Sequence, residues 1–153
     1  MKVYTIGFTK KSARRFFDLL RASGARRIVD VRLNNSSQLS GFAKQDDLAY
    51  FLRELCGMEY AHLPQLAPTQ EILSDYRKKR IDWETYEALF MELMRERRIE
   101  ETIPEEVMRD GCLLCSEDRP HHCHRRLVAE YLAREWDKLD IVHIGHPGES
   151  GAE

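Results

Sequence analysis

Cysteine and histidine are concentrated in one short segment near the end of the chain. Residues 112–126 read CLLCSEDRPHHCHRR and contain three of the four cysteines and three of the six histidines. Thiols and imidazoles at this density are typical either of a metal site or of a pocket with a reactive thiol. The two alternatives require different geometries, which the surrounding pattern helps to separate.

Four of these side chains could bind zinc by type and spacing: Cys112, Cys115, Cys123 and His124. However, residues 111–116 read as an apolar strand, in which residues three apart point to opposite faces. Cys112 and Cys115 would then not bind one ion, so we predict no four-ligand zinc site and no metal ligand. A smaller site of Cys115, Cys123 and His124 stays open. A redox Cys-x-x-Cys is expected at a helix N-terminus, so Cys112 is interpreted as a core residue.

Cys123 is expected near the N-terminus of a helix, where the free N–H groups and the helix dipole favour a thiolate or a bound anion. Arg125 adds positive charge and is a candidate for binding an anionic substrate. We therefore predict that Cys123, or Cys115, is a nucleophile and that His124 or Glu117 transfers protons. In the alternative interpretation Cys123 is a packed cap residue and His124 a hydrogen-bonded structural histidine. His121 and His122 are expected to face solvent.

A second candidate site is the pair Asp30 and Arg32, at the end of a strand-like run that is otherwise Ile and Val. Residues two apart share a face of a strand. The pair is either an internal ion pair or an anion-binding arginine with its acidic partner, and we favour the second. Thr9, just after the first strand, is a further substrate-binding candidate. Tyr60 and His62 share a face of a short strand and either line the pocket or pack in the core.

Apolar periodicity and capping residues predict strands that alternate with helices. Thr9 or Ser12 is expected to cap the first helix, Asp46 the second, and Thr102 with Glu105 a later short one. The long helix is expected to bury Tyr86, Leu89, Phe90, Leu93 and Met94. The predicted strands are 2–7, 26–32, 58–63, 111–117 and 140–145; the predicted helices are about 13–23, 46–56, 69–79, 82–97, a short one near 105, and 123–136; the predicted loop is 33–42.

This alternation predicts a single three-layer α/β domain over residues 1–145, with a mainly parallel sheet and helices on both faces. Residues 146–153 are expected to form a flexible tail. Ligand sites in such sheets lie beyond the carboxyl ends of the strands. The ends near Gly7, Arg32 and Cys115 should therefore meet at one crevice, with Cys115 and Cys123 facing each other.

Composition limits the classes of function. The 153 residues have a formal net charge of −2, whereas proteins that coat nucleic acid usually have a large positive excess. No apolar run approaches the ~18 residues of a membrane span, and no signal peptide is recognisable at the N-terminus. We therefore predict a cytoplasmic protein without membrane contacts, in which disulfides are not expected.

Three motifs, in order, resemble the domain of unknown function 488 family: TIGFT at residues 5–9, VDVR at 29–32 and LLCSEDRPHHCHR at 113–125. The family pattern Leu-x-Cys-x-Glu followed by Cys-His-Arg falls on Leu113, Cys115, Glu117, Cys123, His124 and Arg125. Many members have His-Ser where this chain has Phe8 and Thr9. The resemblance implies a fold and the position of a site, without naming a reaction.

We predict an enzyme that acts on an anionic substrate, such as a nucleotide or a nucleic-acid end, without a cofactor. The alternatives are a module that binds nucleic acid or an anionic ligand without chemistry, or a protein that binds zinc or iron. Exposed basic residues such as the YRKKR run at 76–80 would serve the binding module. The sequence does not determine the oligomeric state.

Overall fold

The computed structural model describes residues 1–35 and 41–146. Its centre is a five-stranded, all-parallel sheet in the order β3-β2-β4-β1-β5. Gly7 lies beside Cys115 in the β1–β4 register, and Asp30 beside Leu114 in the β2–β4 register. The ends of β1, β2 and β4 therefore meet at one edge. The strands are β1 Lys2–Gly7, β2 Arg27–Asp30, β3 Glu59–His62, β4 Gly111–Cys115 and β5 Asp140–His143.

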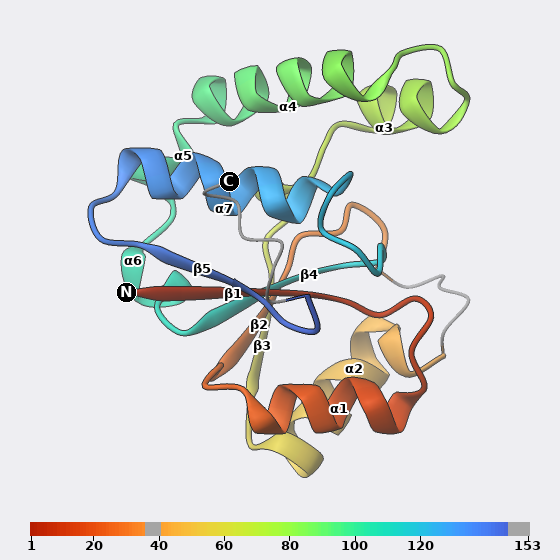
Figure 1. Cartoon of the computed structure of the whole chain (residues 1–153), viewed down its shortest axis with the longest axis vertical. Helices are drawn as coiled ribbons and strands as arrows, with labels where there is room; N and C mark the ends of the chain where they lie inside the picture. The colour runs from red at the N-terminus through yellow and green to blue at the C-terminus, as the bar shows by residue number, and fades with distance from the viewer. Residues whose placement is uncertain (36–40, 147–153) are drawn as a thin grey trace.

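Helices cover both faces of the sheet, which confirms the predicted three-layer α/β fold (Figure 1). Helices α1 and α2 lie on one face, α7 lies on the other, and α4 packs on the outer side of α7. The helices are α1 Ala13–Ala22, α2 Gln45–Phe51, α3 Gln70–Arg77, α4 Trp83–Arg97, α5 Ile99–Thr102, α6 Glu105–Met108 and α7 His124–Glu135, with shorter helical segments at Gly41–Ala43, Leu52–Cys56 and Pro64–Leu66.

Two apolar cores form, one on each face of the sheet, because side chains alternate along every strand. The core under α7 contains Cys115, whereas the core under α1 contains Cys112. The two cysteines thus lie on opposite faces, as the strand pattern predicts, and they do not share a site. Burial also raises the pKa of the Cys112 thiol, which is consistent with a packed, unreactive residue.

Ser12, one of the two predicted caps of the first helix, caps α1. Thr69 and Asp82, where two further helices were expected to begin, cap α3 and α4. The side chains of Ser12, Thr69 and Asp82 each accept a hydrogen bond from the backbone N–H three residues later. Two capping predictions are wrong. Lys44, rather than Asp46, precedes α2, and Thr102 ends α5 while Pro104 precedes α6.

The outer helix α4 differs from the prediction on one face. Leu89 is exposed and Leu93 is only half-buried, although Tyr86, Phe90 and Met94 are buried as expected. Because α4 packs on α7 rather than directly on the sheet, a narrower stripe of its surface is covered. Leu89, at the edge of that stripe, therefore stays in contact with water.

The predictions for the tail and for part of the 33–42 loop fall outside the described residues. Within residues 1–35 and 41–146, none of the helices combines the length and the apolar character that a membrane crossing requires.

Candidate active site

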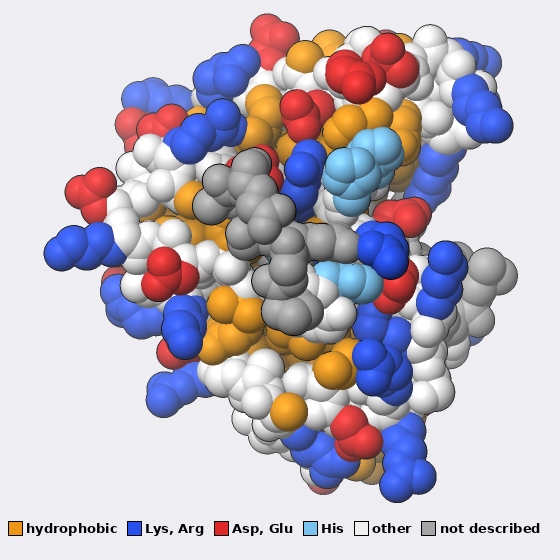
Figure 2. Space-filling model, viewed as in Figure 1, with side chains coloured by type: hydrophobic (Ala, Val, Ile, Leu, Met, Phe, Trp, Pro, Cys, Tyr) orange, Lys and Arg blue, Asp and Glu red, His pale blue; other side chains and the backbone are white. Residues whose placement is uncertain are grey.

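A cavity of about 430 Å³ opens at the carboxyl ends of β2 and β4. Helices α3 and α4 form its outer wall and the start of α7 closes its inner end. In Figure 2, histidine, basic and acidic side chains surround the hollow at the right-hand edge, below the α3–α4 layer. The lining residues are Arg32, Leu33, Asn34, Pro68, Leu73, Tyr76, Arg77, Trp83, Tyr86, Cys115, Ser116, Glu117, His122, Cys123 and His124.

Five of the eight predicted site residues line this cavity: Arg32, Cys115, Glu117, Cys123 and His124. They come from two chain segments about 80 residues apart, which meet because β2 and β4 are neighbours in the sheet. Thr9, Asp30 and Arg125 do not line it. These three lie behind the lining residues and hold them in place through the contacts described below.

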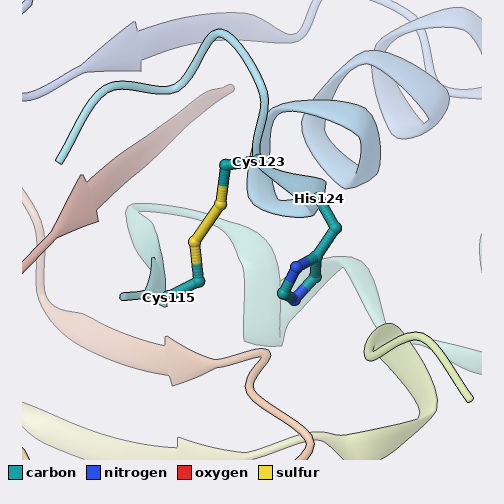
Figure 3. Close-up of side chains that lie close together, drawn as sticks. All are labelled: Cys115, Cys123 and His124. Carbon is teal, nitrogen blue, oxygen red and sulfur yellow. A yellow bond between two sulfur atoms is a disulfide. The ribbon is translucent and has the colours of Figure 1, made fainter. Parts of the chain in front are cut away.

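Cys115 and Cys123 face each other and are joined by a disulfide (Figure 3). The prediction that the chain lacks disulfides is therefore wrong. Cys115 ends β4 and Cys123 precedes α7, so the loop that connects these elements returns the chain to the same strand end. Cys56 and Cys112 are free thiols.

Both sulfur atoms lie in positively polarised surroundings. Cys123 occupies the N-cap position of α7, at the positive end of the helix dipole. The guanidinium of the buried Arg125 donates a hydrogen bond to Cys115 Sγ at 3.4 Å. Once the disulfide is reduced, each environment favours the thiolate over the thiol.

The imidazole of His124 lies beside the two sulfurs (Figure 3). Its Nε2 is 2.7 Å from the Val31 carbonyl, which can only accept a hydrogen bond, so Nε2 bears the proton. Nδ1 is consequently left with a free lone pair. Burial lowers the pKa of His124 to about 4, so the ring is neutral at pH 7.

Asp30 and Arg32 form a buried, bidentate ion pair, in which the two residues have exposed fractions of 0% and 4%. Arg32 Nε donates to Asp30 Oδ1 at 2.9 Å and Arg32 Nη2 donates to Oδ2 at 2.8 Å. The Tyr60 hydroxyl donates to Oδ2 at 2.5 Å, so the neighbouring strand also supports the carboxylate. The guanidinium lies over the ring of Phe8, 5.2 Å from its centroid.

One guanidinium nitrogen of this pair is unused. Arg32 Nη1 is buried and has no hydrogen-bond partner among the described residues. A buried unsatisfied donor costs about 1–3 kcal/mol, and native proteins rarely keep one without a reason. Since Arg32 lines the cavity, its positive charge is placed to attract an anionic ligand there.

The loop between β4 and α7 is held from behind by Arg125 and Thr9. Arg125 is fully buried and donates to the carbonyls of Glu117 and Asp118 and to Thr5 Oγ1. The Thr9 hydroxyl donates to the Ser116 carbonyl at 2.7 Å. Both residues therefore position Cys115 and the loop that follows it. The Glu117 carboxylate is exposed at the cavity, and it is the backbone carbonyl of this residue that binds Arg125.

Gly7 permits this arrangement through close approach. A Cβ at this position would lie 1.6 Å from the Glu117 carbonyl oxygen and 3.0 Å from the Arg125 guanidinium. We expect Gly7→Ala to lower the free energy of unfolding by roughly 3 kcal/mol, because backbone must move to relieve the clash. Urea denaturation measures this loss.

Gly41→Ala is the matched control, since a Cβ there meets nothing within 4 Å. It should stay within ~0.5 kcal/mol of the wild type. Equal stability of the two variants would contradict the close approach of the 116–118 loop to the end of β1.

Sequence analysis missed the outer wall of the cavity. Tyr76 and Arg77 end α3, and Trp83 begins α4, with the ring of His122 stacked 4.7 Å from that of Trp83. His122 is exposed, as predicted, yet it borders the site. The sequence marks Tyr76 and Arg77 only as part of the basic run at 76–80. Their place at this cavity depends on how the α3–α4 pair folds back over the strand ends.

The fold and the cavity define a three-layer α/β protein with two cysteines and a histidine at the carboxyl ends of its strands. The family model described as "Domain of unknown function DUF488" matches residues 12–132, so the chain belongs to this family. The matched range includes all five predicted residues that line the cavity. Neither the curated proteins nor the solved structures that we compared include a match to the chain.

Proposed function

We propose that this protein is an enzyme that acts on an anionic substrate in the cavity between β2, β4 and the start of α7. Arg32 binds the substrate's negative group, and the Cys115–Cys123 pair supplies the reacting thiolate. The observation that carries this proposal is Arg32, a cationic residue that borders the same cavity as both sulfurs and whose buried Nη1 has no hydrogen-bond partner among the described residues.

Arg32 suits anion binding because its other donors are already used. Asp30 holds Nε and Nη2, and the Phe8 ring lies below the guanidinium plane, so the group cannot rotate away. A pre-oriented guanidinium loses little conformational entropy when it binds an anion. Two nitrogens therefore fix the side chain, and the third remains for the substrate.

The chemistry requires the reduced state of the cysteine pair. A dithiol or phosphine reductant supplies two electrons, and two protons from water give two thiols. The thiolate of Cys123, or of Cys115, then attacks the electrophilic centre next to the substrate's anionic group. The bond to the leaving group breaks and the leaving group takes a proton from water. A second water, activated by the Glu117 carboxylate as general base, then hydrolyses the covalent intermediate and regenerates the thiol.

The cavity also indicates the size and type of the substrate. Its volume of about 430 Å³ falls within the range of roughly 300–1,000 Å³ that small-molecule sites occupy. Arg77 adds a second positive charge at the wall, and Tyr76 and Trp83 add flat apolar surface. These features support a substrate with both an anionic and a planar part, such as a nucleotide or a nucleic-acid end.

Alkylation of the reduced protein tests both halves of the proposal. With a chelator present, we expect Cys115 and Cys123 to react with anionic iodoacetate in preference to neutral iodoacetamide, relative to Cys56. The paired variant Asp30→Asn/Arg32→Met removes the guanidinium without leaving a buried charge. It should lower the iodoacetate-to-iodoacetamide ratio about tenfold, a ~1.4 kcal/mol effect that is modest for charges a few ångströms apart. Inorganic phosphate should slow the wild-type reaction.

The matched control replaces an exposed arginine–carboxylate pair at the start of α5, Arg98→Met/Glu101→Gln. It should leave the ratio unchanged. If the ratio in the wild type equals that of the Arg32 variant, Arg32 does not bind anions. If both cysteines stay unmodified until the reduced protein unfolds, the thiol chemistry is wrong and a non-catalytic binding module becomes the better assignment.

A further inference from the structure

We propose that, after reduction, Cys115, Cys123 and His124 bind one thiophilic divalent cation, with Zn²⁺ as the best match to the donors. The inference goes beyond the proposed function, because the bound ion would hold both sulfurs as metal thiolates and block their action as nucleophiles. Metal occupancy would thus regulate the site.

The three donor atoms are already grouped. One ligand atom from each residue lies within 4.8 Å of the other two. At Zn–S distances near 2.3 Å and Zn–N distances near 2.0 Å, the donors of a tetrahedral site lie about 3.5–3.8 Å apart. The Cα atoms of Cys115 and Cys123 are 7.6 Å apart, so two reduced side chains can point at an ion between them without bringing the backbone closer.

His124 has the hydrogen bond that a metal-binding histidine requires. Its Nε2–H donates to the Val31 carbonyl, which fixes the ring and leaves the Nδ1 lone pair as the donor for the ion. Histidines that bind metals almost always donate their second ring N–H to a carboxylate, a backbone carbonyl or water.

The charges around the sulfurs favour the same conclusion. Cys123 at the helix N-cap and Cys115 beside the Arg125 guanidinium are both disposed to be thiolates. Two adjacent thiolates repel each other unless a cation lies between them. A divalent ion bound to both sulfurs removes this repulsion.

The donor set selects the class of ion. Two thiolates and one imidazole suit zinc and other thiophilic metals, whereas magnesium and calcium prefer oxygen ligands. Three protein ligands leave one tetrahedral position, as in zinc sites that also bind water or a substrate. All three ligands and Arg32 line the same cavity. An anion bound at the fourth position of the metal would therefore lie in the cavity that Arg32 borders.

The states are related by a simple balance. One phosphine and one water molecule reduce the disulfide to two thiols. The phosphine supplies two electrons and becomes its oxide, and the water supplies the oxygen and both protons. Binding of the ion then displaces up to two protons from the thiols, without electron transfer. Reoxidation to the disulfide by a disulfide oxidant would release the ion.

The test uses the whole chain, reduced with a phosphine and exchanged into metal-free buffer without oxygen. Zn²⁺ is titrated against a chromophoric chelator, and Co²⁺ is followed by its thiolate charge-transfer absorption. We expect one ion per chain. Cys115→Ser or Cys123→Ser should abolish stoichiometric binding and the cobalt band. His124→Gln should weaken binding by at least about 10–100-fold, because the loss of an outer-shell partner already costs that much and His124 is a direct ligand. The controls Cys56→Ser and Cys112→Ser should bind normally.

Wild-type protein provides a measurement that does not depend on the folding of a variant. Zn²⁺ should protect Cys115 and Cys123 from iodoacetamide, while Cys56 continues to react. Unprotected cysteines, or zinc binding that survives both serine variants, would overturn the metal site. The proposed function is tested separately from the metal site. The variant Asp30→Asn/Arg32→Met is expected to lose the preference for iodoacetate but to bind zinc normally. A protein that binds no zinc but retains that preference would refute the metal site alone.

Discussion

Replacing Arg125 with methionine is expected to lower the free energy of unfolding by about 3–5 kcal/mol. The fully buried guanidinium donates to the Glu117 and Asp118 carbonyls, to Thr5 Oγ1 and to Cys115 Sγ. Each buried acceptor that loses its donor costs about 1–3 kcal/mol, and methionine replaces none of them. Urea denaturation of the variant and wild-type proteins, both with the disulfide intact, measures the difference.

The control for this prediction lies on the same helix. Arg134 is exposed on α7, and Arg134→Met should change the stability by no more than ~0.5 kcal/mol. A loss below ~1 kcal/mol for Arg125→Met would show that the loop between β4 and α7 does not depend on this side chain. The disulfide, β4 and α7 would then be sufficient to position the two sulfurs.

Arg32→Met is expected to cost about 3–5 kcal/mol, because it leaves the Asp30 carboxylate buried without its counter-charge. The Tyr60 hydroxyl would remain as a partner of that carboxylate, and it bears no positive charge. The paired variant Asp30→Asn/Arg32→Met should recover most of the loss, since no buried charge remains. A double-mutant cycle by urea denaturation measures the coupling.

Arg21 provides the comparison on an exposed surface. It pairs with Asp18 on α1, and Arg21→Met should cost at most about 1 kcal/mol. If Arg32→Met were equally mild, the Asp30–Arg32 pair would not be structural. The contacts support two roles at once: two guanidinium nitrogens stabilise the fold, and the third is available to a ligand. The ion pair and the anion site were predicted as alternatives, and one Arg32 side chain can serve both.

Local sequence patterns were sufficient to predict the layers of the fold. Runs of β-branched residues predict β1 and β2, and helical apolar spacing together with Ser12, Thr69 and Asp82 predicts three of the helices. These features depend on residues close together in the chain, so they can be recognised before the tertiary structure is known. Capping failed at Thr102 because the turn between α5 and α6 follows the packing of Ile99 and Met108 into the core.

The sequence by itself also determined most of the candidate site. Cys115, Glu117, Cys123 and His124 lie within ten residues, and the rule that ligands bind beyond the carboxyl ends of parallel strands adds Arg32. The alternation of side chains along β4 separated Cys112 from Cys115, as the two cores confirm. Each of these inferences rests on a periodicity or a short spacing.

Only the tertiary structure decided how those residues are used. The pairing of Cys115 with Cys123 depends on where the loop returns to the strand end, and the burial of Arg125 depends on how close the loop comes to Gly7. The free lone pair of His124 depends on the Val31 carbonyl, 93 residues away in the chain. The cavity wall likewise requires α3 and α4 to fold over β2 and β4. Contacts between segments so distant in sequence arise when the sheet orders its strands, and no local pattern of residues encodes them.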